Sequence, residues 1–450
     1  MASPLGTGAV ATDGATDAVF AYPGWRRNLV FVWIGVFVGL LGANFVFPFI
    51  PFFIKDLGVT DNARVSYYAG LTASATGLSL TLTAPLWGAL SDRVGRKVMF
   101  VRALVGAGII IGVMGLAQAV WQLVALRFLM GAFAGTFGAA AALVAATTPR
   151  ERAGQALGLL QTGQFLANML GPVAGGIVAA SLGIRESFVF CCGLYLTAAV
   201  LAYAFVREPR ETLAPRPAPG EEKSGGSLSG NLRAVVSERQ ILVMLGMLFV
   251  LWLSTTYVRP VMPISIDDFA SHSNRPGGAV DRVSLQLPGM HATMKETTAT
   301  GLVFGMIGMT STIAALSVAP LGQRVGYRNA VTGAALLTGI FYIPVFFAGS
   351  FTTFLLFFGA VGLFQGAMVP GTNALIAASA PEGKQGSAFG LASSMQSMAL
   401  LIGPLAGGAT SGLLGIRSIY LVIGVILVIA AVAGRFLIRE PEFYGKPRRA

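Results

Sequence analysis

Long apolar stretches follow one another along almost the whole chain, separated by short polar segments. A helix needs about 20 mostly apolar residues to cross the hydrocarbon core of a bilayer, and inside that core its backbone groups must bond to one another. The candidate spans are residues 29–51, 66–90, 98–117, 121–146, 154–180, 187–206, 240–264, 298–321, 330–349, 352–377, 385–412 and 417–438. The sequence therefore predicts an all-α membrane protein with twelve transmembrane helices.

The composition excludes the common soluble classes. Charged residues make up 11% of the chain, whereas about 25% is usual in soluble domains, and the mean hydropathy is +0.72. Lys and Arg are dispersed, mainly between the apolar stretches, so the net charge of +12 predicts no nucleic-acid partner. The two cysteines, Cys191 and Cys192, are adjacent in an apolar stretch, which predicts neither a disulfide framework, nor a metal site, nor a cofactor.

Polar segments divide the chain into five parts. Residues 1–24 are small and polar and lack the pattern of a secretory signal peptide, so we interpret them as a disordered cytoplasmic tail. Residues 25–206 and 240–440 each hold six candidate spans. The charged, Pro/Gly/Ser-rich residues 207–239 between them are predicted to form a cytoplasmic linker, and residues 441–450 a second cytoplasmic tail.

The positive charges predict the orientation in the membrane. With the N-terminus inside, the cytoplasmic segments hold 20 of the 31 Lys and Arg residues and the outer segments hold 7. Positive charge is concentrated on the cytoplasmic side of membrane proteins. We therefore expect a multi-pass protein of the cell inner (plasma) membrane with both termini in the cytoplasm. A second polar stretch, residues 265–297, is then an outer loop.

The two halves of the sequence repeat each other. Residues 149–188 align without a gap on residues 381–420 at a constant offset of 232, and both segments contain Gly-Pro, Gly-Gly and Gly-Ile-Arg at matching positions. Two six-span halves repeated in parallel are typical of transporters whose halves rock around a site near the middle of the membrane. We therefore expect two pseudo-symmetric six-helix bundles.

The loop after the second span contains Gly88, Asp92, Arg93, Gly95, Arg96 and Lys97. With this spacing the loop resembles a motif of the major facilitator superfamily, G-x-L-[AS]-D-R-x-G-R-K. Gly95 permits a sharp turn, and Asp92 can pair with arginines or with the positive N-terminus of a helix. We expect a conformational latch that opens when the halves rock or when Asp92 is protonated; a chance positive-inside loop is the alternative.

Two further motifs resemble the same superfamily. Arg127 begins an R-x-x-x-G-x-x-x-G pattern in the fourth span and is a candidate for proton coupling, together with Asp92, or for attracting anions; snorkelling to the outer interface is the alternative. The fifth span resembles the G-P-x-x-G-G motif of the drug:proton antiporter (multidrug efflux) branch through Gly171, Pro172, Gly175 and Gly176. That resemblance implies an exporter, although plain helix packing would also use such glycines.

Polar and aromatic side chains within the spans are candidates for a substrate cavity. Three of them share one face of the fifth span, because their spacing is i, i+3 and i+7. The candidates are Asn44, Gln161, Gln164, Asn168, Trp252, Tyr257, Gln365, Asn373 and Gln396. Amide–amide bonds between helices are the alternative role for each of the amides.

No acidic residue and no histidine lies deep inside a predicted span. Proton coupling must then use acids at span ends, chiefly Asp92, and neutral or anionic lipophilic substrates are favoured over cations. We therefore expect a monomeric exporter of small lipophilic compounds, driven by protons and surrounded by lipid. A facilitator or proton-coupled importer of a nutrient is the alternative, and the absence of nucleophile and phosphate-loop motifs argues against an enzyme.

Overall fold

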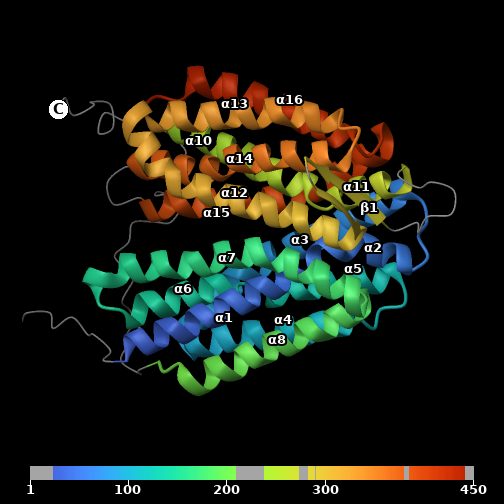
Figure 1. The fold of residues 1–450 in the computed structure, drawn as a ribbon. Coiled ribbons are helices and arrows are strands. Elements are labelled where there is room, and N and C mark those ends of the chain that lie inside the picture. Colours follow the sequence, from blue (N-terminus) through green and yellow to red (C-terminus); the bar gives the residue numbers. More distant parts are fainter. Residues whose placement is uncertain (1–23, 209–237, 273–281, 289, 380–384, 441–450) are drawn as a thin grey trace, which may run out of the picture.

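A computed structural model of the chain describes residues 24–208, 238–272, 282–288, 290–379 and 385–440. The predicted tails and nearly all of the predicted linker lie outside these residues, so what was expected of them stays a prediction. Helices that run roughly parallel to one another make up nearly all of the described structure (Figure 1).

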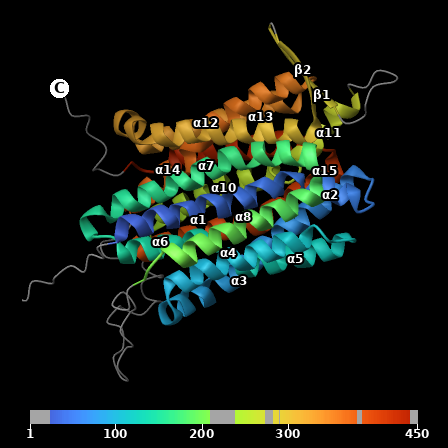
Figure 2. The ribbon, with the colours of Figure 1, turned by 60° about the horizontal axis from the view of Figure 1, so that its bottom comes forward.

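The first half of the chain forms one group of helices, in which α1 packs against α7 and α8, α3 against α5, and α4 against α8. It lies below the second half in Figure 1, and Figure 2 turns α3 and α5 into view. Its elements are α1 (Trp25–Val46), the 3-10 turn η1 (Phe47–Phe49), α2 (Ile50–Asp56), α3 (Asn62–Val94), α4 (Arg96–Met114), α5 (Val120–Phe133), α6 (Thr136–Thr147), α7 (Arg150–Leu182) and α8 (Ile184–Phe205).

The second half forms a matching group, in which α10 packs against α15 and α16, α12 against α14, and α13 against α14 and α16. Its elements are α10 (Arg239–Val258), α11 (Met262–His272), β1 (Arg282–Leu287), β2 (Met290–Lys295), α12 (Glu296–Val325), α13 (Tyr327–Phe346), α14 (Phe351–Ser379), α15 (Gln385–Leu414) and α16 (Ser418–Leu437).

Eleven helical segments in the described part of the chain are long and apolar enough to cross a membrane, against the twelve predicted from the sequence. The segment outside that count is α3, at the place of the second predicted span. Its hydroxyl groups lower its hydropathy, but Thr72, Thr76 and Thr81 each donate to a carbonyl oxygen of the same helix, at 2.8–3.1 Å. Each of these hydroxyls is thereby satisfied without water, as a helix within a membrane requires.

Three predicted spans are interrupted rather than continuous. The first bends at Phe47–Phe49, where Pro48 has no N–H to donate, and the seventh breaks between α10 and α11 next to Pro260. The fourth breaks between α5 and α6 at Gly135, whose φ of +108° favours glycine. These breaks redirect the helices close to the cavity described below.

The polar stretch 265–297 is not simply a loop, which corrects the prediction. Helix α11 continues the seventh span to His272, and β1 and β2 form an antiparallel hairpin in which Arg282 pairs with Lys295. The backbone N–H of Gln286 donates to Thr352 Oγ1 at 2.9 Å, which ties the hairpin to α14. The otherwise all-α fold therefore carries one hairpin, and we call this end of the molecule, with α2, α11, β1 and β2, the hairpin end.

The Gly-Pro motifs of α7 and α15 pack in equivalent ways within their own halves. A Cβ on Gly175 would meet the carbonyl oxygen of Phe45 in α1, and a Cβ on Gly407 would meet that of Tyr257 in α10. Only glycine permits backbones to approach so closely. The shared geometry gives the repeat of the sequence a structural counterpart.

The next glycine of each motif instead faces the opposite half. A Cβ on Gly176 would lie 2.8 Å from the carbonyl oxygen of Thr297 in α12, and one on Gly408 would lie 2.6 Å from that of Ser66 in α3. Helices α7 and α12, and likewise α3 and α15, therefore cross in direct backbone contact. These two crossings hold the halves together.

The halves meet at the hairpin end and separate toward the other. At the hairpin end Lys55 of α2 pairs with Asp267 of α11, and Lys295 donates to the carbonyl oxygen of Ala180 at 2.6 Å. Nearer the opposite end, which we call the linker end because α8 ends and α10 begins there, a Cβ on Gly158 would meet nothing within 4 Å among the described residues. Among the described residues, these contacts between the halves therefore lie at the hairpin end, and Gly158 at the linker end has no counterpart to them.

We expect the variant Gly176→Ala to weaken closure at the hairpin end, because its Cβ must displace the backbone of α12. Overpacking of this kind costs about 1–3 kcal/mol. Trp121 and Phe347 are exposed and lie at the hairpin ends of α5 and α13. The distance between spin labels at these two positions, measured by double electron–electron resonance on the purified protein, should increase. Gly158→Ala is the matched control and should leave the distances unchanged; an equal response in both variants would contradict the role of the crossing.

Candidate functional site

A cavity of about 690 Å³ lies between the two halves. Its walls come from α6 and α7 of the first half and from α10 to α15 of the second. A volume of this size holds a drug-sized molecule. The crossings of α7 with α12 and of α3 with α15 hold the halves together on its hairpin side.

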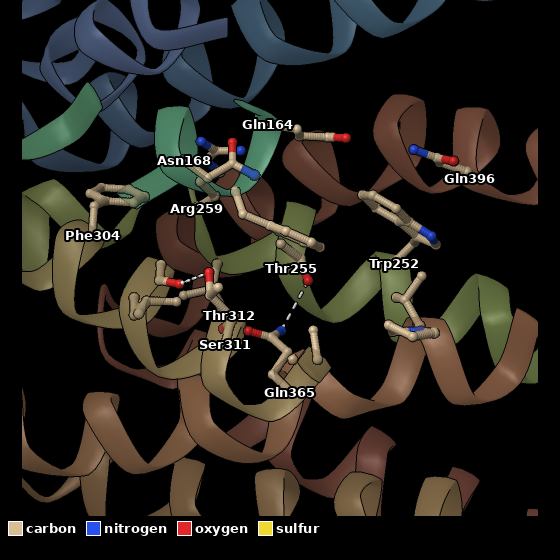
Figure 3. Close-up of a pocket in the computed structure, with 18 of the residues that line it drawn as sticks. Gln164, Asn168, Trp252, Thr255, Arg259, Phe304, Ser311, Thr312, Gln365 and Gln396 are labelled. Atoms are coloured by element: carbon tan, nitrogen blue, oxygen red, sulfur yellow. Dashed lines mark hydrogen bonds between the residues drawn. The ribbon is translucent and has the colours of Figure 1, made fainter. Parts of the chain in front are cut away.

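The cavity brings together seven of the nine side chains predicted for it. These are Gln161, Gln164, Asn168, Trp252, Gln365, Asn373 and Gln396, several of which are labelled in Figure 3. Asn44 lies one layer behind the wall, where its Nδ2 donates to Asn168 Oδ1 at 2.8 Å. Tyr257 does not line the cavity, since it is buried and its hydroxyl donates to Thr410 Oγ1 at 2.6 Å. Whether these residues bind a substrate stays a prediction.

The amides divide into bonded and unbonded groups. Gln365 Nε2 donates to Thr255 Oγ1 at 3.0 Å, the bond drawn in Figure 3, and to Ser254 Oγ at 3.2 Å. The amide of Gln164 forms no hydrogen bond with any described residue, and the same is true of Gln396 across the cavity. Such groups are available to a ligand or to water within the cavity.

The rest of the wall is largely apolar and aromatic. Phe137 and Phe165 contribute from the first half, and Trp252, Phe304 and Phe358 from the second. Aromatic walls with a few polar groups are typical of sites for small lipophilic molecules. The cavity therefore suits a ligand with an apolar body.

The cavity has one charged lining residue among those the structure describes, and it is Arg259. This partly buried arginine lies in the break between α10 and α11, and its Nη2 donates to Asn44 Oδ1 of α1. Its guanidinium carbon lies 4.8 Å from the centre of the Phe47 ring and 5.7 Å from that of Phe304. No set of His, Cys, Asp and Glu side chains in the described residues could hold a metal ion.

Arg259 was not among the predicted site residues, although the sequence contains a signal for it. It is an arginine followed by Pro260 within an apolar stretch, and charged residues inside spans are most often functional. Because Phe45 and Tyr257 occupy equivalent places against α7 and α15, Arg259 is also the counterpart of Phe47 in the repeat. Its distance from the predicted midplane made it look like a span end.

Arg127 lies inside the first half, behind the cavity wall. Its side chain is 5% exposed, and its guanidinium carbon lies 5.6 Å from the centre of the same Phe47 ring. Its Nη1 contacts Met130 Sδ at 3.9 Å, and its Nε has no partner among the described residues. This interior position favours a functional role over snorkelling, and the role itself stays a prediction.

The predicted latch is only partly within the described structure. The surroundings of Gly88 and the side chains of Asp92 and Arg93, at the end of α3, lie outside it, so the pairing of Asp92 stays a prediction. Gly95 forms the turn between α3 and α4 with a φ of +110°, which agrees with the reason given for a glycine there. Lys97 Nζ donates to the carbonyl oxygen of Tyr203 at 2.8 Å, which links the loop to the end of α8.

A glutamate that sequence reasoning missed holds this loop. The carboxylate of Glu208, just after α8, accepts hydrogen bonds from the backbone N–H groups of Arg96 and Lys97 at 3.0 and 2.9 Å. A carboxylate at a helix N-terminus satisfies free N–H groups and complements the helix dipole. Glu208 therefore caps α4.

The second half contains the same arrangement. Glu440, just after α16, accepts from the backbone N–H groups of Tyr327 and Arg328 at 2.6 and 2.8 Å, at the start of α13. The sequence signal is the tripeptide Arg-Glu-Pro, which occurs at 207–209 and again at 439–441, with the same offset of 232 as the longer repeat. In each half, the residues that follow the last helix are thus bonded to the start of the helix at the third span, which is α4 in the first half and α13 in the second.

We expect Glu208→Ala and Glu440→Ala each to destabilise the protein, since two N–H groups at a helix end lose a charged acceptor. Hydrogen bonds to charged groups contribute about 1.5–3 kcal/mol each, and less where water reaches them. Thermal unfolding of the purified protein in detergent should show a lower midpoint for both variants. Glu238→Ala removes an exposed carboxylate at the start of α10 that accepts no side-chain cap hydrogen bond, and it should lower the midpoint less than either variant; shifts no larger than that of Glu238→Ala would exclude the capping role.

A sequence model of the Major Facilitator Superfamily matches residues 32–280 and 282–450. Among curated proteins, the chain is similar to multidrug resistance protein MdtG of Enterobacter lignolyticus, with 29% identity over 408 residues that cover 91% of each chain.

Two solved structures have similar folds. One is a bacterial homologue of the human lysosomal transporter Spinster in an inward-facing, unoccupied conformation, with a TM-score of 0.72, 13% identity, and coverage of 93% of this chain and 98% of that one. The other is the human organic anion transporter MFSD10, with a TM-score of 0.60, 20% identity, and coverage of 92% and 100%.

Proposed function

Because the chain belongs to the major facilitator superfamily and is a multi-pass membrane transporter of small molecules, we propose that it exports small lipophilic compounds, neutral or anionic, in exchange for protons. It works as a monomer by alternating access, with residues 25–206 and 240–440 as the moving halves. The name of the relative MdtG supports multidrug efflux, and the name of MFSD10 supports anionic substrates.

The observation that carries this proposal is the chemistry of the cavity. Its walls are largely apolar and aromatic, its free amides can bond to many different ligands, and its one charge among the described lining residues is positive. A cavity without a carboxylate has nothing to compensate a cationic drug, because burying an unpaired charge is costly. The substrate class that fits is therefore lipophilic and either uncharged or anionic.

The orientation that the positive charges predict supports entry of the ligand from the cytoplasm. The linker end faces the cytoplasm, because most Lys and Arg residues lie in segments at that end. In the described residues the contacts between the halves lie toward the hairpin end, and in this proposal the cavity receives its ligand from the cytoplasm or from the inner leaflet. Rocking of the halves then opens the hairpin end and releases the ligand outside.

Proton coupling is assigned to acids at the ends of the helices. Asp92 lies at the linker end, and its protonation would weaken the latch. At the hairpin end Asp267 pairs with Lys55 of the other half, and protonation of Asp267 from outside would remove that ion pair. A proton at either place therefore favours separation of helix ends that are otherwise held together.

Transport by the purified protein in liposomes tests this function. With an imposed pH gradient, we expect uptake of neutral and anionic lipophilic dyes into vesicles whose embedded proteins face inside out, and little uptake of quaternary ammonium dyes of the same size. Collapse of the gradient with an ionophore should abolish accumulation. For exchange, uptake of the dye must accompany the movement of protons out of the vesicles. Movement of the dye in the same direction as the protons would instead support the alternative, a proton-coupled importer.

We expect Asp92→Asn to slow exchange severalfold, because the latch loses the charge whose protonation switches it. The measurement is the initial rate of dye uptake in the same vesicles. Glu238→Gln, at the same end of the molecule and outside the latch, is the control. An unchanged rate for Asp92→Asn would show that the latch is incidental to transport.

A further inference from the structure

We propose that Arg259 selects the charge of the substrate: it binds the acidic group of an amphiphilic monoanion, and this group replaces Asn44 as the acceptor of the arginine. The proposal rests on the proposed function and adds to it the chemical class of the substrate and the residue that recognises it. The ligand carries a carboxylate, or an acidic group of similar size, on an apolar body.

The position of Arg259 makes it reachable from the cavity. It lies in the break between α10 and α11, next to Pro260, and points toward Asn168 on α7 (Figure 3). Gln164, whose amide is unbonded, lies one helical turn along α7 from Asn168. An acidic group beside Arg259 would therefore also have amide donors within the same part of the cavity.

The positive charge of Arg259 is poorly compensated. Its hydrogen-bond acceptor in the described structure is the uncharged amide oxygen of Asn44, and the faces of Phe47 and Phe304 lie beside it. Arg127 brings a second guanidinium to the Phe47 ring. A guanidinium has five N–H donors in a planar fork that matches a carboxylate, so an incoming anion gains strong, charge-assisted hydrogen bonds.

Asn44 is held so that its oxygen faces Arg259. Its Nδ2 donates to the carbonyl oxygen of Leu40 and to Asn168 Oδ1, both at 2.8 Å, which uses both N–H groups. The remaining oxygen accepts from Arg259. The amide is thereby a built-in, uncharged acceptor that a charged ligand can outcompete.

The contact between Asn44 and Arg259 also joins the halves, since Asn44 belongs to α1 and Arg259 follows α10. Opening of the hairpin end must pull these helices apart and leave the arginine without an acceptor. A bound anion supplies a new acceptor, so the occupied transporter no longer loses a hydrogen bond when it opens. Substrate binding therefore promotes release of the closed hairpin end.

Binding of a matched pair of probes tests the inference. The probes are 2-naphthylacetic acid and 2-naphthylacetamide, which differ in charge but hardly in shape, measured by calorimetry with the full chain in nanodiscs of zwitterionic lipid. We expect the acid to bind at least about tenfold more tightly than the amide, as charge-assisted bonds exceed neutral ones. Arg259→Met should bring this ratio to about one, and Arg259→Lys should keep part of it. Arg102→Met is the control, because Arg102 stacks on Trp87 away from the cavity and its loss should leave the ratio unchanged.

Variants of Asn44 should change the ratio in opposite directions. Asn44→Asp gives Arg259 a permanent carboxylate and should abolish the preference for the acid. Asn44→Leu removes the competing acceptor and should raise the affinity for the acid severalfold. A merely structural contact would weaken both probes equally in both variants.

The outcomes separate this inference from the proposed function. If the wild-type protein binds both probes equally, or if Arg259→Met keeps the preference, Arg259 does not select charge, and export of lipophilic compounds still stands. If neither probe binds and none of the lipophilic dyes is transported in liposomes, the cavity is not the substrate site, and the proposed function fails as well.

Discussion

The direct contact of helix backbones between the halves is the constraint on which this structure depends. In a bilayer no hydrophobic force drives one apolar helix onto another, so association depends on close packing. At the crossings of α7 with α12 and α3 with α15, glycines bring the backbones together where any side chain would separate them. Because these crossings lie toward one end, the halves are held at the hairpin end and leave a cavity between them.

The absence of water from the bilayer core also determines how charged side chains are stabilised in the interior. The arginines within the bundle lie against aromatic rings: Arg127 and Arg259 share Phe47, and Arg102 lies 3.5 Å from the centre of the Trp87 ring. A ring face stabilises a cation without neutralising it, so a positive potential persists at the cavity. Carboxylates are instead used at the ends of the helices, where Glu208 and Glu440 cap α4 and α13.

Hydropathy predicted the helices because a membrane span has a length fixed by the bilayer, and that signal is local in the sequence. The repeat predicted two pseudo-symmetric bundles, in which the Gly-Pro motifs do pack alike, and the cavity holds most of the predicted amides. The breaks near Phe47 and Arg259 were missed, since an apolar stretch with a proline reads as one continuous span. Tyr257 was misplaced because the side of a helix that faces the cavity depends on its partner helix, which no local pattern reveals.

Phe47 and Arg259 occupy matching places in the two halves, one aromatic and one cationic, with the break of a helix beside each. A duplicated architecture of this kind offers two equivalent positions for a side chain beside the cavity. Exchange of the side chain at either position would alter the electrostatic potential of the cavity while every helix stays where it is. Descendants of one ancestral gene could thereby diverge from uncharged to acidic cargo through single-codon steps.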